Sequence, residues 1–366
     1  MKKIVAIIDT MKIGGAQKNL LYYLSYLASQ KYCVTLISLK KTNKYSIPSN
    51  ITFLEILDEK ESIMTNFFTV LQIVTENSKC ADVIVGFMDY ISNYIAYLVS
   101  KVNDTKLLLA SRSHLKKSIQ IFNDTEEINY SLSKLIYEKS AIIVQSSFIK
   151  KELIDCLKLE NENISILSNS IDLESVANSE LEIFNNNKVF IVVARFVKLK
   201  RIDIIIEAFH SLIQSKYKNI KLLITGYGEE KENLQKLVQS LALVDNVIFK
   251  EESQQILSLL KSSHVSILAS EYEGFSNFIL ESMSQKSLVI ASNIGANKEL
   301  IKHKETGLLY RLNDTEDLCD KMIFSLENIE EVNNIKNKAY SFLNYFNKEK
   351  NCIEFENILL DLKKTK

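Results

Sequence analysis

The sequence is poor in the residues that usually mark loops. Its 366 residues include eight glycines, one proline and no tryptophan. Glycine permits positive φ angles and a close approach of the backbone to another molecule, so a chain with few glycines should keep them where a turn or a ligand demands one. We expect nearly all of them at the ends of strands: Gly14, Gly15, Gly86, Gly226, Gly228, Gly274, Gly295 and Gly307.

The chain also lacks an excess of charge of either sign. Its 45 lysines and arginines balance 45 aspartates and glutamates, which gives no electrostatic argument for nucleic acid as a partner. The cysteines are few and show no C-x-x-C spacing, which excludes the usual zinc pattern and favours reduced, buried thiols in a cytosolic protein over a disulfide framework. There are five of them: Cys33, Cys80, Cys156, Cys319 and Cys352.

Long apolar runs are missing as well. The first apolar run, "IVAII", is too short for the core of a signal peptide and is typical of a strand. No segment approaches the roughly 20 apolar residues that span a bilayer. We therefore expect a cytoplasmic location, with the inner face of the cytoplasmic membrane reached only peripherally. Candidate lysines for that contact, with ordinary solvated lysines as the alternative, are Lys116, Lys117, Lys150 and Lys151.

Short β-branched runs alternate with longer segments of helical periodicity. Segment 16–30 has leucines and tyrosines recurring at three and four, which predicts a helix. Nearly continuous apolar strands separated by helices indicate a parallel sheet covered on both faces. The strands predicted for this first series are 2–9, 32–39, 81–87, 105–111, 140–146 and 163–169.

The alternation is interrupted by a polar segment and then resumes. Asn, Ser and Glu dominate the interruption, and a chain of this length is expected to hold two domains, so we predict domains at 1–170 and 188–344 joined by a linker at 171–187. The segment 322–364 is predicted to be helical throughout. The second series of strands is predicted at 188–194, 219–226, 246–250, 264–270 and 287–294. Ligands of such sheets bind at the carboxyl ends of strands, so two facing domains are expected to form a cleft.

Glycines follow strands in both predicted domains. Gly14 and Gly15 lie between the first strand and the first long helix, where unpaired amides and the helix dipole suit an anion or a sugar hydroxyl. The spacing is neither G-x-G-x-x-G nor a Walker sequence, and a plain turn is the alternative. Gly226 closes a later strand and is a candidate for ligand contact, although the glutamates that follow it stabilise a helix start without any ligand.

A cluster of cations follows the first strand of the second domain. Arg195 and Lys200 are five residues apart, so their side chains can converge on one diphosphate through charge-assisted hydrogen bonds. Lys198 and Arg201 extend the cluster to four cations, whose alternative interpretation is a solvated charged turn.

The segment "SEYEGFSNFILESM" places a glycine between two glutamates. Ser276 is a plausible helix N-cap, so Glu273 would lie in the preceding loop and Glu281 one to two turns into the helix. This geometry gives two separate acceptors for sugar or ribose hydroxyls, and leaves the amides after Gly274 to face phosphate. Eight residues is a long separation for a shared metal, and no other cluster offers divalent ligands.

One histidine lies at the end of a predicted strand. His114 follows the segment 105–111 and is close in sequence to Arg112. A neutral imidazole there could hydrogen-bond a substrate or an oxyanion, although a lone histidine is a weak signal. His210, His264 and His303 are more typical of packing or loop positions.

Together these motifs resemble the retaining, nucleotide-sugar-dependent glycosyltransferases of family 4, which have the two-domain GT-B fold. The resemblance preserves order along nearly the whole chain. It is carried by "GGAQKNL", "VARFVKLKRIDIIIEAF", the E-x7-E motif "EGFSNFILE", "SNIGANKELI" and "TGLLY". The resemblance implies two Rossmann-like domains facing across a cleft, an acceptor-binding domain at 1–170, a nucleotide-sugar-binding domain at 188–344, and a helix at 345–366 that packs back on the first domain.

The resemblance also implies a role for each matched residue. Arg195 and Lys200 would hold the donor diphosphate and neutralise the leaving group, Glu281 would accept the ribose hydroxyls and Glu273 the donor-sugar hydroxyls. Gly15, in the loop with Gly14, would approach the diphosphate from the first domain, and His114 matches a position where some members carry an active-site histidine. Backbone contacts to phosphate and sugar would come from Gly274, Phe275, Ser276 and Asn277.

The implied reaction is transfer of a hexose or N-acetylhexosamine from a nucleotide diphosphate sugar, such as a UDP-sugar, to a glycan or lipid-linked saccharide. It would serve bacterial polysaccharide, lipopolysaccharide or glycoprotein glycan synthesis. The β-phosphate would assist proton removal from the acceptor, so no enzymic nucleophile and no metal or prosthetic group is expected. A nucleotide-sugar epimerase of the same fold and a non-catalytic subunit of a glycosyltransferase complex are the alternatives. A nicotinamide-dependent dehydrogenase is disfavoured because G-x-G-x-x-G is missing.

The chain departs from the family pattern at turns. Arg201 stands where a glycine commonly follows the lysine, and Lys286, Ser287 and Leu288 replace a frequent G-x-P turn. "LSNSIDLE" lacks the proline and glycine often seen around its asparagine. These departures affect turn geometry and leave every predicted ligand in place.

Overall fold

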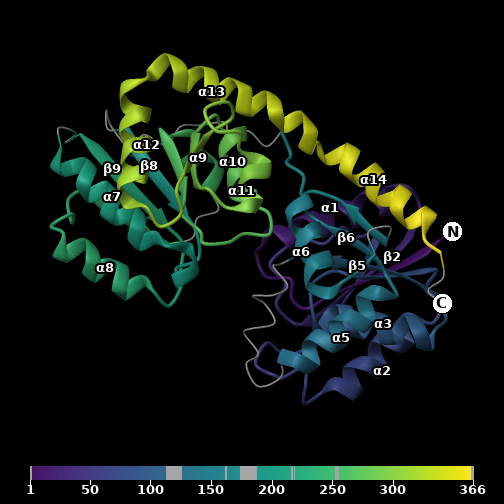
Figure 1. The fold of residues 1–366 in the computed structure, drawn as a ribbon. Coiled ribbons are helices and arrows are strands. Elements are labelled where there is room, and N and C mark those ends of the chain that lie inside the picture. The colour runs from purple at the N-terminus through teal and green to yellow at the C-terminus, as the bar shows by residue number, and fades with distance from the viewer. Residues whose placement is uncertain are drawn as a thin grey trace. The chain divides into compact units, whose positions relative to one another are not determined.

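The structure, a computed structural model, contains two compact units (Figure 1). It describes residues 2–112, 126–160, 163–173, 188–215, 217, 219–251 and 255–363. Unit 1 comprises Met1–Ser170 together with Lys348–Lys366, and unit 2 comprises Ile171–Asn347. Residues 174–187 of the predicted linker lie outside the described residues. The chain therefore leaves unit 1 once, builds unit 2 and returns.

Unit 1 is built on a seven-stranded parallel sheet in the order β3-β2-β1-β4-β5-β6-β7. Its strands are β1 Lys3–Ile8, β2 Cys33–Lys40, β3 Ile51–Leu57, β4 Val83–Gly86, β5 Lys106–Ser111, β6 Ala141–Val144 and β7 Ile164–Ile166. Its helices are α1 Gly15–Ser29, α2 Phe67–Asn77, α3 Ile91–Val102, α5 Glu126–Glu138, α6 Ser147–Leu157 and α14 Lys348–Asp361.

The interior strand β1 shows why this sheet needs cover on both faces. Ile4 and Ile8 pack into one hydrophobic cluster, whereas Val5 and Ile7 pack into another. Successive side chains of a strand point to opposite faces, so an apolar run of this kind supplies two cores at once. The last helix, α14, completes one of them: Phe355 stacks on Tyr23 of α1 with ring centroids 4.7 Å apart.

Unit 2 has a six-stranded parallel sheet in the order β10-β9-β8-β11-β12-β13. Its strands are β8 Lys188–Val193, β9 Ile220–Thr225, β10 Val247–Lys250, β11 Val265–Leu268, β12 Leu288–Ser292 and β13 Leu308–Tyr310. Its helices are α7 Ile202–Gln214, α8 Lys231–Ser240, α9 Ile256–Lys261, α10 Asn277–Ser284, α11 Gly295–Leu300, α12 Thr315–Glu327 and α13 Ile329–Phe342, with 3₁₀ turns η4 Lys198–Lys200 and η5 Leu343–Phe346.

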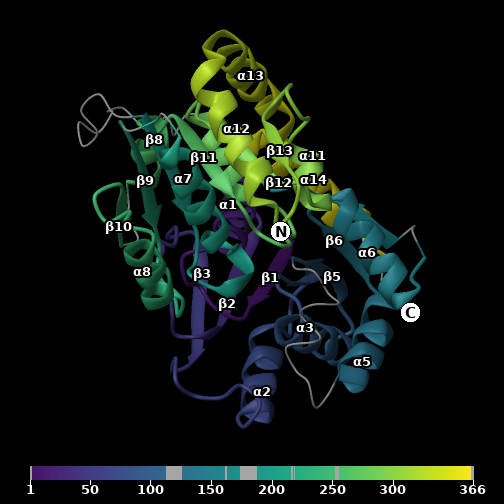
Figure 2. The ribbon, with the colours of Figure 1, turned by 60° about the vertical axis from the view of Figure 1, so that its left-hand side comes forward.

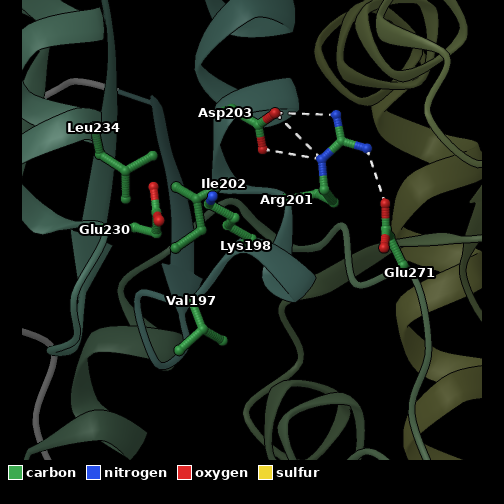
Figure 3. A pocket seen from close by; sticks show the side chains of 8 residues that line it. All are labelled: Val197, Lys198, Arg201, Ile202, Asp203, Glu230, Leu234 and Glu271. Carbon is green, nitrogen blue, oxygen red and sulfur yellow. Dashed lines mark hydrogen bonds and ion pairs between the residues drawn. The ribbon is translucent and has the colours of Figure 1, made fainter. Parts of the chain in front are cut away.

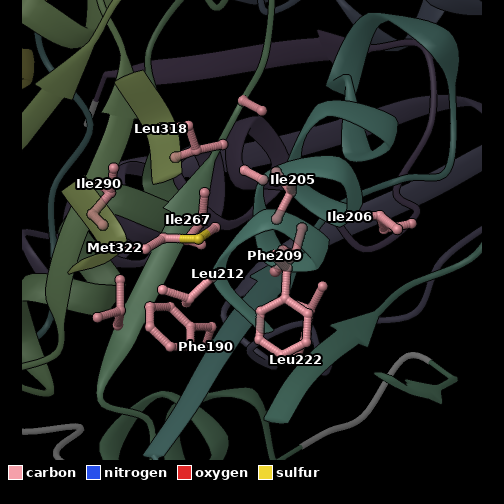
Figure 4. Packing of buried hydrophobic residues seen from close by; sticks show 14 of the residues in the cluster. Phe190, Ile205, Ile206, Phe209, Leu212, Leu222, Ile267, Ile290, Leu318 and Met322 are labelled. Atoms are coloured by element: carbon pink, nitrogen blue, oxygen red, sulfur yellow. The ribbon is translucent and has the colours of Figure 1, made fainter. Parts of the chain in front are cut away.

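Helix α7 anchors the core of unit 2. Its apolar face brings Ile205, Phe209 and Leu212 against the sheet, where Phe209 meets Phe190 edge to face at 6.1 Å (Figure 4). Helix α12 packs beside α7, as Figure 2 shows. The start of α7 is thereby fixed against the sheet, and the turn that precedes it is held at the carboxyl end of β8.

Most predicted strands and helices are confirmed to within a few residues, but two strands were missed. The edge strand β3, Ile51–Leu57, has a half-exposed middle that contains Glu55, so it lacks the continuous apolar signal of its neighbours. The strand β13 has only three residues. The expectation of buried thiols was wrong for Cys33 and Cys80, which are exposed, although all five cysteines are free.

Across the ranges that the structure describes, none of the helices combines the length and the hydropathy needed to cross a bilayer. The same ranges contain no group of three or more His, Cys, Asp or Glu side chains that could hold a metal ion.

Candidate functional site

The carboxyl edge of the sheet in unit 2 gathers the cations and glutamates singled out in the sequence. Strands β8 and β11 are hydrogen-bonded neighbours and run in the same direction, so the loops that follow them meet at one edge. Arg195 follows β8 and Glu273 follows β11. A backbone hydrogen bond of 3.0 Å from Glu271 N to Leu199 O joins the two loops directly.

Lys200 and Glu273 are partners of each other in this structure. Lys200 Nζ lies 2.5 Å from Glu273 Oε1, and each side chain is only 15% exposed. Ser270 Oγ donates to the same carboxylate oxygen at 2.6 Å. The structure therefore joins these two predicted ligands into one half-buried charge pair, a pairing that no local sequence pattern indicates.

Arg195 is the open cation of this edge. Its side chain is exposed and makes no hydrogen bond or ion pair to the described part of the chain. Its charge is felt at Tyr272, where burial raises the pKa of the phenol and the guanidinium opposes that rise. Arg195 is thus available to an anion beside the Lys200–Glu273 pair.

The helix α10 begins as the sequence predicted. Ser276 is its N-cap in extended conformation, and its hydroxyl accepts a hydrogen bond from Ile279 N at 3.4 Å. Phe275 packs edge to face on Phe346 with centroids 5.9 Å apart, so its side chain belongs to the core. Glu281 lies half-buried in the helix, beyond Asn277 at its first position. The N-terminus of α10 is capped by its own serine, and its dipole is positive at the edge where Glu273 lies.

The glycines do not all behave as expected. Among the described glycines, Gly226 and Gly228 have positive φ angles, and Gly274 does not. A Cβ on Gly226 would lie 1.9 Å from Ala194 O, which explains the glycine by packing alone. The Gly14 amide donates to Tyr45 Oη at 2.9 Å, so it is not unpaired as expected; Gly15 begins α1.

A pocket of about 390 Å³ opens beside this site, between the starts of α7 and α8 (Figure 3). Arg201 occupies one side of it and holds Asp203 and Glu271. The predicted donor ligands are not part of its wall, which is formed by Val197, Lys198, Arg201, Ile202, Asp203, Glu230, Leu234 and Glu271.

A second polar cluster, which sequence reasoning missed, lies at the carboxyl edge of the sheet in unit 1. Asp89, which is 6% exposed, accepts hydrogen bonds from Ser111 Oγ at 2.6 Å, Arg112 N at 2.8 Å and Tyr137 Oη at 3.0 Å. Arg112 Nη2 donates to Asn169 Oδ1. The sequence feature that could have indicated this cluster is a polar residue soon after each of two successive strands, Asp89 after β4 and Arg112 after β5.

Arg112 itself is buried without an ion pair among the described residues. Its guanidinium lies 4.8 Å from the centre of the Phe87 ring, and its Nη1 atom has no hydrogen-bond partner. Burial lowers the pKa of Arg112 to about 10. Burial likewise raises the pKa of Asp9, which follows β1, to about 6. In both cases the loss of hydration disfavours the charged form of the side chain, at the buried Arg112 and at the half-buried Asp9.

Some predicted residues lie elsewhere. His114, Lys116 and Lys117 are outside the described residues. Lys150 Nζ donates to Ile164 O at 2.6 Å and is half-buried, whereas Lys151 is exposed. Other histidines are occupied within unit 2, as expected: His264 Nε2 is 3.0 Å from Ser325 O, and His303 Nδ1 accepts from Leu309 N.

Comparisons with known proteins agree with this architecture. The family described as glycosyl transferases group 1 matches residues 176–342. The chain is 27% identical over 360 residues, covering 96% of this chain and 97% of the relative, to the N-acetylgalactosamine-N,N'-diacetylbacillosaminyl-diphospho-undecaprenol 4-alpha-N-acetylgalactosaminyltransferase of Campylobacter jejuni. It is 26% identical over 275 residues, covering 73% and 71%, to the N-acetyl-alpha-D-glucosaminyl L-malate synthase of Bacillus anthracis.

Solved structures show the same fold at low sequence identity. HepE of Anabaena in complex with UDP superposes with a TM-score of 0.84 at 16% identity, covering 99% of this chain and 100% of that one. WaaG, a glycosyltransferase involved in lipopolysaccharide biosynthesis, gives a TM-score of 0.80 at 14% identity over 98% and 100%. The family match, the curated relatives and the fold together support a family 4-like glycosyltransferase with the GT-B fold.

Proposed function

We propose that this glycosyltransferase moves a hexose or N-acetylhexosamine, with retention of configuration, from a UDP-sugar to a saccharide or lipid-linked saccharide acceptor in bacterial glycan assembly. The observation that carries the proposal is the grouping of Arg195, the Lys200–Glu273 pair and the N-terminus of α10 at one edge of the unit 2 sheet. An open guanidinium, an ammonium and a helix N-terminus form a site suited to a diphosphate.

The names of relatives support the choice of donor. The names of both curated relatives described above contain an N-acetylhexosaminyl group. Structural neighbours were solved with UDP and with UDP-glucose. A UDP-linked N-acetylhexosamine or hexose is therefore the donor that we propose for this chain.

The proposed chemistry needs charge stabilisation more than a protein nucleophile. As the bond from the sugar C1 to the diphosphate oxygen breaks, negative charge grows on the diphosphate, where Arg195 and Lys200 would stabilise it. The acceptor oxygen then bonds to C1 on the same face, and its proton passes to an oxygen of the leaving phosphate. No metal is required in this scheme, because the two cations and the helix dipole supply the positive charge.

The other predicted residues would bind and orient the donor. Glu281 would accept hydrogen bonds from the ribose hydroxyls and Glu273 from the sugar hydroxyls, with backbone contacts from Gly274 onwards. Binding of sugar hydroxyls by Glu273 would require its carboxylate to be shared with Lys200, since the two are already paired. Gly15 and His114 remain proposed ligand-binding residues.

Thermal unfolding with a panel of nucleotides tests the donor class. Ligand at 100 times its dissociation constant adds about 2.7 kcal/mol to the free energy of unfolding, so UDP and one UDP-sugar should raise the unfolding temperature while AMP does not. Incubation of the stabilising UDP-sugar with lipid-linked or soluble saccharides, followed by NMR of the product anomer, tests transfer with retention. An inverted anomer, or conversion of the donor alone to its epimer, would contradict the proposal.

Peripheral membrane contact follows only if the acceptor is lipid-linked. Lys151 is the exposed candidate in the described range. Attraction to anionic lipid is strongest at low ionic strength, where the Debye length is long. Absence of co-sedimentation with phosphatidylglycerol vesicles at low salt would rule out this part of the proposal.

A further inference from the structure

Arg201 adopts a backbone conformation that is unfavourable for any residue with a Cβ. Its φ and ψ angles are 44° and 45°, in the left-handed region, between the 3₁₀ turn Lys198–Lys200 and the helix α7. For a residue other than glycine this conformation costs roughly 1–2 kcal/mol. A glycine at this position would avoid that cost, so the arginine side chain must supply something that glycine cannot.

The side chain of Arg201 binds three partners from three segments. Nε lies 3.2 Å from both carboxylate oxygens of Asp203, and Nη2 lies 3.0 Å from Asp203 Oδ2. Nη1 donates to Glu271 Oε1 at 3.1 Å, in the loop after β11 (Figure 3). Nη1 also donates to Asn313 Oδ1, in the loop after β13. The guanidinium is therefore committed to protein acceptors and is not offered to a diphosphate.

Arg201 belongs to a series of bonds between the same two segments. Leu199 O accepts from Glu271 N, Lys200 pairs with Glu273, and Arg201 pairs with Glu271. Three successive residues of the turn before α7 are thus fixed to the loop after β11. The Arg201–Glu271 pair is partly buried, with side chains 23% and 36% exposed, so water weakens it only in part.

We propose that Arg201 is a positioning residue of the donor site, which clamps the turn before α7 to the loop after β11 and so sets the place of Lys200 and Glu273. The inference rests on the proposed function, because it assigns a purpose to the geometry of the same site. It separates the four cations of this turn by role: Arg195 is open, Lys200 is paired within the site, Lys198 is exposed, and Arg201 holds the two loops together.

The test exploits the left-handed backbone. Arg201→Gly removes the clamp, and relief of the unfavourable φ offsets the stability that is lost with its hydrogen bonds and ion pairs. The unfolding temperature, measured beside the affinity, shows whether a weaker binding comes from the site or from a less stable fold. Lys286→Gly is the matched control, because Lys286 is a second left-handed cation in unit 2, at φ 55°. We expect Arg201→Gly to weaken UDP binding in calorimetry by about tenfold with an unfolding temperature not below that of the wild type. Lys286→Gly should bind UDP as the wild type does.

Two further variants separate positioning from a general electrostatic effect. Glu271→Gln should weaken UDP binding about as much as Arg201→Gly, although it removes a negative charge rather than a positive one. The double variant should be no weaker than either single variant, because both break the same link. Arg201→Lys should recover part of the affinity through its charge.

The outcomes distinguish the inference from the function it rests on. Unchanged UDP affinity in Arg201→Gly, or fully additive losses in the double variant, would overturn the clamp while leaving the donor site intact. Tighter UDP binding in Glu271→Gln would also overturn it, since it would show simple charge repulsion. Failure of the wild-type protein to bind UDP would remove both the clamp and the proposed UDP donor.

Discussion

In unit 1 the polar side chains that follow β4 and β5 are buried and bonded to one another, whereas in unit 2 the groups that follow β8 and β11 remain accessible. Asp89 and Arg112 are 6% and 7% exposed. Arg195 is exposed, and the Lys200–Glu273 pair is half-buried. The two edges come from sheets of the same kind, with parallel strands ending side by side.

The comparison shows that a doubly wound sheet does not make its carboxyl edge a binding site by topology alone. In unit 1 the polar groups satisfy one another, and their removal should change stability. In unit 2 the charges are incompletely compensated, and their removal should change ligand binding. The predictions that follow test this division, beginning with the largest expected effect.

Asp89→Ala should destabilise the protein by about 3–5 kcal/mol. The substitution leaves the donors Ser111 Oγ, Arg112 N and Tyr137 Oη without their acceptor, and each buried unpaired group costs roughly 1–3 kcal/mol. Urea unfolding of the purified variant measures the change. Asp58→Ala is the control, since Asp58 is a 70% exposed ion-pair partner and its loss should change the unfolding free energy by about 0.5 kcal/mol or less. Similar changes in unfolding free energy for the two variants would contradict the view that polar groups at the edge of unit 1 mainly stabilise the fold.

Lys200→Ala should reduce transfer from the UDP-sugar by about 10²–10³-fold, or about 2.7–4 kcal/mol, because it removes a preorganised charge from the leaving diphosphate. Initial rates of UDP release at saturating acceptor measure this. Lys236→Ala, which removes an exposed lysine from α8, is the control and should retain full activity. Full turnover by Lys200→Ala would place the diphosphate elsewhere.

Asp9→Asn should stabilise the protein at neutral pH by on the order of 2–3 kcal/mol. Burial raises the pKa of Asp9 from 3.8 to about 6, so the native state holds this proton more tightly than the unfolded state does. Stability therefore falls as pH rises from about 4 to 6, and the penalty is complete above pH 6. Urea unfolding at pH 4, 5, 6 and 7.5 should show the difference between variant and wild type growing across this window. A difference that is constant with pH would argue that burial does not raise the pKa of Asp9.

Lys286→Gly should be more stable than Lys286→Ala by about 1 kcal/mol. Both variants lose the contact between the Lys286 ammonium and the Tyr340 ring, but only glycine relieves the left-handed backbone at the end of α10. Thermal unfolding of the two variants measures the difference, and their rates of UDP release should be equal. A difference between their rates would mean that the turn after α10 affects the proposed donor site, in addition to residues before α10 such as Glu273.

The fold was predicted well from the sequence because buried strands such as β1 and β8 are continuous runs of apolar residues, which local composition reveals. It missed β3, since Glu55 interrupts the apolar pattern at an edge where one strand neighbour is absent. Arg201 and Lys286 were recognised as departures at turns, and both lie at positive φ. Among the described residues, several lysines and one arginine adopt left-handed backbone conformations that glycine would adopt at lower cost.

The site was only partly predictable. The motif placed Arg195, Lys200 and Glu273 at strand ends, but their pairing depends on side-chain geometry between residues 73 positions apart. The burial of Arg112 could not be predicted either. A polar residue after a strand can face water or bond to a distant residue such as Asn169, and the local sequence does not distinguish the two. Local pattern therefore locates the charged groups, and only packing decides which of them a ligand can reach.

Because the chain returns to unit 1 through α14, the two units are completed at different times during translation. Unit 2 is continuous from Ile171 to Asn347, so all of its strands leave the ribosome in one stretch. Unit 1 lacks Phe355, the stacking partner of Tyr23, until the whole of unit 2 has been made. Domains generally fold as units during translation, and here the first domain to begin is the last to be completed.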